Sequence, residues 1–338
     1  MNRRSLLSLV AATGACAAFG VSAADKKKPP VPSWLKASDR PPGLGVYLGA
    51  GCTGVGHLGE FEAWLGRKVD QMLEFIGWDV LEQSTAWGVN CWNKAAQAVV
   101  YSMPMLPPKA KGTLSDGVNG KFDDLFRKYA AILINSGYAD AVIRIGWEFN
   151  ANWYPWSATK DPQTWAEYWH RIAILLRETP GARFKFDWCP AAFGKGFSPE
   201  RAYPGDDVVD FIGLDFYNMP IDSKAKTPEQ RWKSRFDMHT GLRWHRDFAQ
   251  SHRKRMSYPE WGTGPHKQYG GAVDDAYFIE QMAAWMTENK VAYHNYWNYK
   301  SKDLDTRLSN GSQPNAAAAF IKYFGANEHA HGKLRMSS

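Results

Sequence analysis

The chain has 338 residues, of which 44% are apolar and 22% charged, and its formal net charge is +7. This composition is that of an ordinary globular protein and excludes a disordered, collagen-like or coiled-coil chain. The basic runs at 26–28 and 253–255 are too short to indicate a nucleic-acid-binding protein. The 16 Trp, 15 Tyr and 17 Phe residues are unusual, and they indicate an aromatic-lined site or large interfaces.

Residues 1–24 have the pattern of an export signal. Arg3 and Arg4 precede an apolar stretch from Leu6 to Val21, and small residues at 21–23 fit a cleavage site. The segment 2–7 also resembles a twin-arginine signal. The apolar stretch is short for a membrane span, and no stop-transfer pattern follows it. We therefore expect an exported protein, periplasmic or secreted, that has no membrane contact after cleavage.

The rest of the chain predicts one globular domain between two irregular ends. Residues 25–42 are rich in Lys and Pro and predict a leader, and 326–338 predict a polar tail. Between 43 and 325 there is no linker or change of composition. Short apolar runs alternate there with helical patterns. The expected strands are 43–48, 68–76, 98–103, 141–146, 183–189, 208–215, 255–260 and 291–297, and the expected helices include 121–136, 162–178, 227–252 and 274–289.

Eight strands with helices between them in one domain favour a single (β/α)8 barrel. The competing architecture is an open, doubly wound parallel sheet. Functional groups of a (β/α)8 barrel lie at the carboxyl ends of its strands. The strand ends are therefore the places where we look for chemistry.

Two of the expected strands end in a glutamate. Glu148 follows the run Val-Ile-Arg-Ile-Gly-Trp, and Glu260 lies in the run Tyr-Pro-Glu-Trp-Gly. The two are 112 residues apart, which is about three βα units of about 39 residues each, so they belong to strands four and seven. Two carboxylates that face each other among aromatic rings suit glycoside cleavage. One protonates the leaving oxygen, and the other attacks the anomeric carbon or activates water.

The strand-four segment resembles a motif of glycoside hydrolase family 26, a family of retaining enzymes in clan A. The segments 213–217 and 259–262 resemble that family's strand-six and nucleophile segments, and 45–47 and 61–67 resemble its opening strand and first turn. The resemblance covers about 43–325. The strand-four residues that match are Arg144, Glu148, Phe149, Asn150, Trp153, Tyr154 and Trp156.

The resemblance implies that Glu148 is the general acid/base and Glu260 the nucleophile of a retaining endo-β-glycoside hydrolase. Tyr217 would hydrogen-bond Glu260, Arg144 would support it, and Asn150 would contact sugar or hold its loop. The candidate substrate-binding residues are Trp153, Tyr154, Trp156, Trp188, Trp261, Trp297, Tyr47 and Asp215, although Asp187 and Asp215 could instead cap layers of the barrel.

We expect an enzyme that needs no cofactor or metal and takes a polysaccharide as its substrate. We also expect a monomer, although the sequence does not determine the oligomeric state. One residue departs from the family pattern, because Trp147 stands where a His commonly precedes the acid/base. This departure puts β-mannan in doubt and opens β-glucan, xylan or a bacterial exopolysaccharide. A non-catalytic polysaccharide-binding protein on the same barrel is the first alternative.

A second alternative is an exported oxidoreductase, because residues 49–54 read Gly-Ala-Gly-Cys-Thr-Gly, and Asp70 follows about 20 residues later. We reject it because Gly56 and Gly59 should break the helix that a dinucleotide site requires. A flexible loop that lines the cleft explains these glycines more simply. After signal cleavage, Cys52, Cys91 and Cys189 allow at most one disulfide, and the sequence leaves open which pair forms it.

Overall fold

A computed structural model of the chain describes residues 29–36, 41–77, 81–95, 97–106, 112–193, 195–219, 224–267 and 273–326. The expected export signal lies outside the described residues, as does the polar tail beyond its first residue. Within the described residues, no helix is both long and apolar enough to cross a membrane.

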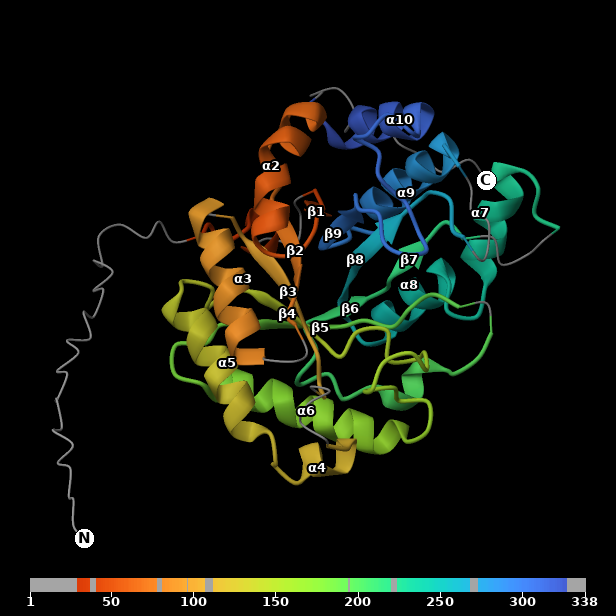
Figure 1. Cartoon of the computed structure of the whole chain (residues 1–338). Coiled ribbons are helices and arrows are strands. Elements are labelled where there is room, and N and C mark those ends of the chain that lie inside the picture. The colour runs from red at the N-terminus through yellow and green to blue at the C-terminus, as the bar shows by residue number, and fades with distance from the viewer. Residues whose placement is uncertain are drawn as a thin grey trace, which may run out of the picture.

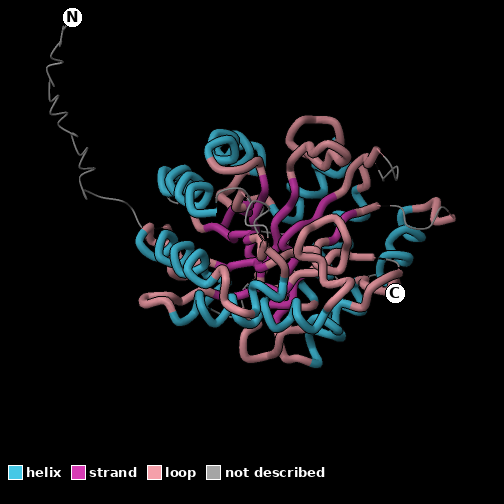
Figure 2. Tube along the Cα trace, turned by 60° about the horizontal axis from the view of Figure 1, so that its bottom comes forward, coloured by secondary structure: helices cyan, strands magenta, loops and turns pink. Residues whose placement is uncertain are grey.

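The strands form one closed parallel barrel, which confirms the expected fold. Their order is β6-β5-β4-β3-β2-β1-β9-β8, and β8 pairs with β6 to close the ring, while the two-residue β7 pairs with the far end of β8. Figure 2 shows the strands gathered at the centre with helices around them. The strands are β1 (Gly43–Tyr47), β2 (Gln71–Phe75), β3 (Val99–Met103), β4 (Val142–Ile145), β5 (Lys185–Trp188), β6 (Phe211–Gly213), β7 (Phe216–Tyr217), β8 (Arg255–Gly262) and β9 (Tyr293–Trp297).

The helices follow the strands along the chain and form the outer layer, as Figure 1 shows. Every residue of β1 and β3 is buried, as expected for parallel strands that are covered on both faces. The helices are α1 (Ser33–Lys36), α2 (Cys52–Leu65), α3 (Leu81–Ala95), α4 (Leu114–Val118), α5 (Asp123–Asn135), α6 (Pro162–Glu178), α7 (Pro228–Asp237), α8 (Leu242–Ser251), α9 (Ala276–Glu288) and α10 (Pro314–Phe324).

The expected helix 227–252 is two helices, α7 and α8. Local signals place its start correctly, because Thr227 forms a capping box with Gln230, and Pro228 occupies the first turn. The interruption has a tertiary cause. Thr240, between the two helices, exchanges hydrogen bonds with the backbone N–H and carbonyl of Phe193. A single continuous helix could not make these contacts.

The expected leader contains part of the core, so the expectation that the fold begins near Gly43 is wrong. Trp34 on α1 is 2% exposed, and its ring centre lies 4.7 Å from that of Tyr293 on β9. Its indole N–H donates to the side chain of Gln71 at 2.8 Å. Gly43 opens β1 directly against this ring, where a Cβ would lie 1.9 Å from it. Trp34 therefore closes the end of the barrel at which the strands begin.

Candidate active site

Glu148 stands in a tight turn directly after β4. Both Gly146 and Glu148 have positive φ angles, of 55° and 53°, and such a backbone costs a non-glycine residue about 1 kcal/mol. The N–H of Glu148 donates to the carbonyl of Cys189 at 2.8 Å, which ties this turn to the end of β5. The indole N–H of Trp153 donates to its carboxylate at 3.0 Å. The chain thus holds this carboxylate at the strand end despite local strain.

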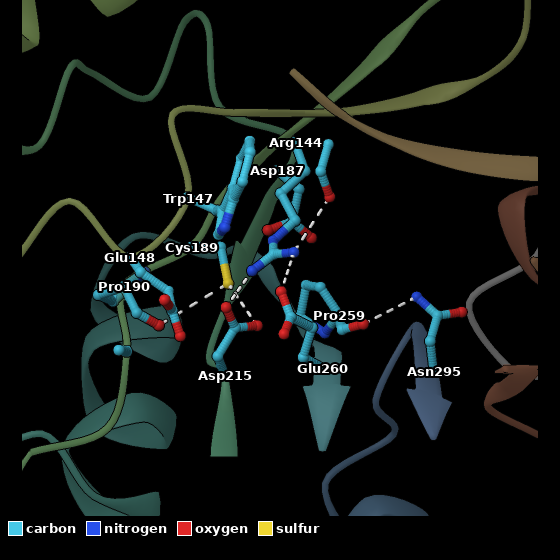
Figure 3. Close-up of polar contacts among 12 residues, drawn as sticks. Arg144, Trp147, Glu148, Asp187, Cys189, Pro190, Asp215, Pro259, Glu260 and Asn295 are labelled. Atoms are coloured by element: carbon cyan, nitrogen blue, oxygen red, sulfur yellow. Dashed lines mark hydrogen bonds and ion pairs between the residues drawn. The ribbon is translucent and has the colours of Figure 1, made fainter. Parts of the chain in front are cut away.

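Glu260 lies in β8 and is almost fully buried. Arg144 donates to its Oε1 at 2.5 Å, and the hydroxyl of Tyr217 donates to its Oε2 at 2.9 Å. Burial raises the pKa of Tyr217 well above its ordinary value, so the hydroxyl keeps the proton that it donates. Arg144 also pairs with Asp215, and Figure 3 shows its guanidinium between the two carboxylates. The Glu260 carboxylate is therefore fixed by a donor at each oxygen.

The two glutamates come from strands that are far apart in the sequence, and they meet over the barrel. One carboxylate oxygen from each of Glu148, Asp215 and Glu260 lies within 4.8 Å of the others. Burial, and after it the negative charge of Glu260, raise the pKa of Glu148 to about 8. At neutral pH, Glu148 is therefore a protonated acid beside a fixed carboxylate.

Three carboxylates so close together have the donor chemistry of a cation site. The cluster already contains a cation, however, because the Arg144 guanidinium donates to an oxygen of Asp215 and to an oxygen of Glu260. Arg144 is fully buried, and it donates to Ser102 as well. Its fixed positive charge offsets the repulsion between these acids within the protein.

The chain is similar in sequence and fold to known glycoside hydrolases. The family model of glycosyl hydrolase family 26 matches residues 109–230, which include Glu148 and Tyr217 but not Glu260. Over this segment, the chain is similar to glycoside hydrolase family 26. It is 26% identical over 286 residues to Endoglucanase H from Acetivibrio thermocellus, a match that covers 79% of this chain and only 28% of that protein.

Solved structures share the fold of this chain. The YdhT protein from Bacillus subtilis superposes with a TM-score of 0.60 at 13% identity and covers 86% of this chain and 88% of its own. The catalytic domain of a family 26 endo-β-1,4-mannanase from a Bacillus species gives a TM-score of 0.59 at 15% identity, with 88% and 89% covered. At these identities the likeness extends to the barrel alone.

Three of the expected sugar platforms are buried in the core, so these expectations are wrong. Trp156, Trp188 and Trp261 are each 0% exposed. Their indole N–H groups are satisfied inside the protein, by the carbonyls of Trp147 and Ala202 and by the His294 ring, respectively. A buried indole with its N–H paired cannot present a face to a polysaccharide.

Asp215 and Asn150 could each bind substrate or support the fold, and their contacts favour the supporting role. Asp215 is 2% exposed and pairs with Arg144, so it supports the site rather than contacting substrate. Asn150 exchanges two 2.8 Å hydrogen bonds with the backbone of Ala191, so it holds the loop after β4. Asp187 is also buried, and it accepts hydrogen bonds from Ser257 and Tyr293 inside the barrel.

The remaining expected aromatics form part of the wall around the glutamates. Trp153 is 53% exposed, and Tyr154 and Trp297 are half-buried. Tyr47 is 8% exposed, and its ring stacks on Trp297 with centres 4.1 Å apart. Phe75 at the end of β2 was not among the expected residues, and its ring lies between these aromatics and Trp147. Its position at a strand end was the available signal.

Trp147 places an apolar ring at the position where the family that the chain resembles commonly has a His. It is 2% exposed, its ring centre lies 5.2 Å from that of Phe75, and its N–H donates to the Tyr154 hydroxyl. The guanidinium carbon of Arg144 lies 5.7 Å from its ring centre. The face of the site beside Glu148 is therefore built from rings.

The glycine-rich segment is structural, although for a different reason from the one expected. The helix α2 runs through Gly56 and Gly59, so the expectation that they break it is wrong. The N–H of Gly51 donates to the buried Glu74 carboxylate at 2.6 Å. The Glu74 carboxylate thus accepts a hydrogen bond from an N–H at the start of α2. In a dinucleotide site, that N–H would bind a phosphate. Cys52 forms a disulfide with Cys91, and Cys189 is a free, buried thiol.

Proposed function

We propose that this chain is a retaining endo-β-glycoside hydrolase that cleaves a β-linked polysaccharide. The pair of Glu148 and Glu260 carries the proposal, because one is protonated at neutral pH and the other is fixed by two donors. Their nearest oxygens are within 4.8 Å. An inverting enzyme needs roughly 6.5–9.5 Å between its carboxyl groups to admit a water, so the short separation supports retention.

In the first step, Glu148 would donate its proton to the glycosidic oxygen while a carboxylate oxygen of Glu260 attacks the anomeric carbon. The C–O bond to the leaving sugar breaks, that sugar departs as an alcohol, and a glycosyl ester forms on Glu260. The raised pKa of Glu148 keeps the proton available at neutral pH. Arg144 and Tyr217 hold the nucleophile in place.

In the second step, the ionised Glu148 would accept a proton from a water molecule that attacks the anomeric carbon. The ester bond to Glu260 breaks, the sugar leaves with its original configuration, and Glu148 is again protonated. The loss of the neighbouring negative charge in the ester lowers the pKa of Glu148, because that charge is one of the causes that raise it. This change suits the switch from acid to base.

The substrate class follows from the relatives and from the wall of the site. The names of the relatives, an endoglucanase and an endo-β-1,4-mannanase, support β-glucan and β-mannan as candidates. Trp147 in the family's His position supports β-glucan or a bacterial exopolysaccharide over β-mannan, because a buried apolar ring stands there in place of a polar side chain. The basic and apolar pattern of residues 1–24 supports action outside the cytoplasm.

A panel of polysaccharides tests the proposal. Wild type is incubated with β-mannan, mixed-linkage β-glucan, carboxymethyl-cellulose, β-1,3-xylan and the host's exopolysaccharide, and new reducing ends are measured. Glu148→Gln and Glu260→Ala should each lose roughly a thousandfold or more of the rate. Glu60→Gln, on the exposed side of α2, is the matched control and should keep the full rate.

Two results would overturn the proposal. If wild type binds a polymer but releases no new reducing ends, the protein is a polysaccharide-binding protein instead. A released product whose anomeric configuration is inverted, as detected by NMR, would reject the glycosyl-ester mechanism even if the polymer is cleaved.

A further inference from the structure

Trp87 on α3 is a large aromatic side chain that is 48% exposed. Among the described residues, the only other exposed tryptophan is Trp153, beside Glu148. Because α3 follows β2, its N-terminal half lies at the end of the barrel where the strands finish. Both exposed tryptophans therefore belong to the face that carries the glutamates.

The position of Trp87 is fixed by its neighbours. Its six-membered ring lies against the backbone of Gly51, where a Cβ would be 2.3 Å away. Gly51 is itself held by its hydrogen bond to Glu74. Cys91 follows Trp87 by one helical turn, on the same side of α3, and its disulfide joins Cys52, the residue after Gly51. The disulfide thus fixes α3 against the start of α2, and the contact with Gly51 positions the exposed ring.

A series of aromatic contacts connects this place with the catalytic pair. Trp147 contacts Phe75, Phe75 contacts Tyr47, and Tyr47 stacks on Trp297. Tyr299 continues the series, with its ring centre 5.3 Å from that of Tyr47. The series reaches the loop after β1, because a Cβ on Gly49 would lie 3.4 Å from the Tyr299 ring. Gly51, which the Trp87 ring contacts, lies two residues further along this loop.

We propose that Trp87 is an outer sugar-binding platform, which stacks on a pyranose ring of the polymer at a distance from the scissile bond. The inference rests on the proposed function and deepens it, because the length of the polysaccharide would then determine its affinity. An exposed indole offers an apolar face that matches the C–H patches of a pyranose ring. Because Gly51 already positions the ring and the disulfide fixes its helix, little side-chain freedom is lost on binding.

Kinetics on long and short substrates test this proposal. Trp87→Ala and Trp87→Phe are compared with wild type on the polysaccharide that wild type cleaves and on an aryl disaccharide of the same sugar. Trp87→Ala should raise KM for the polymer about tenfold, with kcat little changed. It should leave kcat/KM for the aryl disaccharide within about twofold, and Trp87→Phe should recover most of the polymer affinity. Asn90→Ala, exposed on the same helix, is the matched control.

An unchanged KM for the polymer, or an equal loss on both substrates, would overturn the platform. If wild type cleaves no polysaccharide, the proposed function fails. The platform is then tested by native electrophoresis in gels that contain each polymer, where binding slows migration. Retardation of wild type that Trp87→Ala abolishes would support the platform independently of catalysis. Equal migration of the two in every gel would overturn it.

Discussion

At the scale of single residues, surroundings give two identical side chains different roles. Glu148 and Glu260 carry the same carboxyl group, yet only Glu260 has an arginine and a tyrosine hydroxyl as donors. Glu148 has the Trp153 indole N–H and the field of its charged neighbour. A pKa raised by burial and by a like charge is the usual signature of a general acid.

The raised pKa of Glu148 carries a cost in stability that a neutral side chain would remove. Its pKa is about 8 in the folded protein and 4.5 as a free group, so the unfolded chain loses this proton first as pH rises. Stability therefore falls between pH 4.5 and 8, and Glu148→Gln should recover about 1–3 kcal/mol at pH 8.

Urea unfolding of wild type and Glu148→Gln at pH 4 and pH 8 measures this effect. At pH 4 both states of the wild type are mostly protonated, so the two proteins should differ little. A variant that is equally or less stable than wild type at pH 8 would show that Glu148 is not held in its neutral form.

At the scale of elements, the loops that follow β1 and β2 are joined by a disulfide and by a hydrogen bond. The disulfide between Cys52 and Cys91 links the start of α2 to α3. Glu74, at the end of β2, accepts hydrogen bonds from the N–H of Gly51 and the indole of Trp92. The glycine-rich loop is thus held by contacts to β2 and α3.

Removing the disulfide should destabilise the whole domain. The bond joins residues 39 positions apart, and closing a loop of this size is worth about 3–4 kcal/mol. We expect the double variant Cys52→Ser/Cys91→Ser to lose that amount in urea unfolding. A reducing agent should lower the stability of wild type toward that of the variant and leave the variant unchanged. Equal stability of oxidised wild type and variant would contradict the prediction.

At the scale of the whole molecule, the two ends of the barrel have separate tasks. The end where the strands finish carries Glu148 and Glu260, and the end where they begin is closed by Trp34 from the segment before β1. Trp34 packs on Tyr293, whose hydroxyl donates to Asp187 further inside. Closure at one end therefore supports the buried polar side chains beneath the site.

Trp34→Ala should cost about 3–5 kcal/mol of unfolding free energy, because it empties the space of a large buried side chain. The KM of the remaining folded protein should stay unchanged, since Trp34 lies at the other end of the barrel. Trp87→Ala, which removes an exposed indole, is the matched control for stability and should cost less than about 1 kcal/mol. A Trp34→Ala protein as stable as wild type would show that the segment before β1 is dispensable.

The strand order, the barrel and the pairing of Glu148 with Glu260 were all within reach of the sequence. Buried parallel strands are short apolar runs, and the regular βα repeat places residues three units apart across the barrel mouth. Helix starts such as Thr227-Pro228 were equally legible, because capping is a local interaction.

Tertiary structure alone decided which aromatic rings are exposed and where the fold begins. Trp153 and Trp156 lie three residues apart in one loop, yet the first is 53% exposed and the second is fully buried. A tryptophan suits a core and a sugar platform equally well, so its residue type does not separate the two. The same applies to Trp34 in a segment without periodicity and to Trp87 on a helix: burial depends on partners distant in the chain, such as Tyr293 and Gly51.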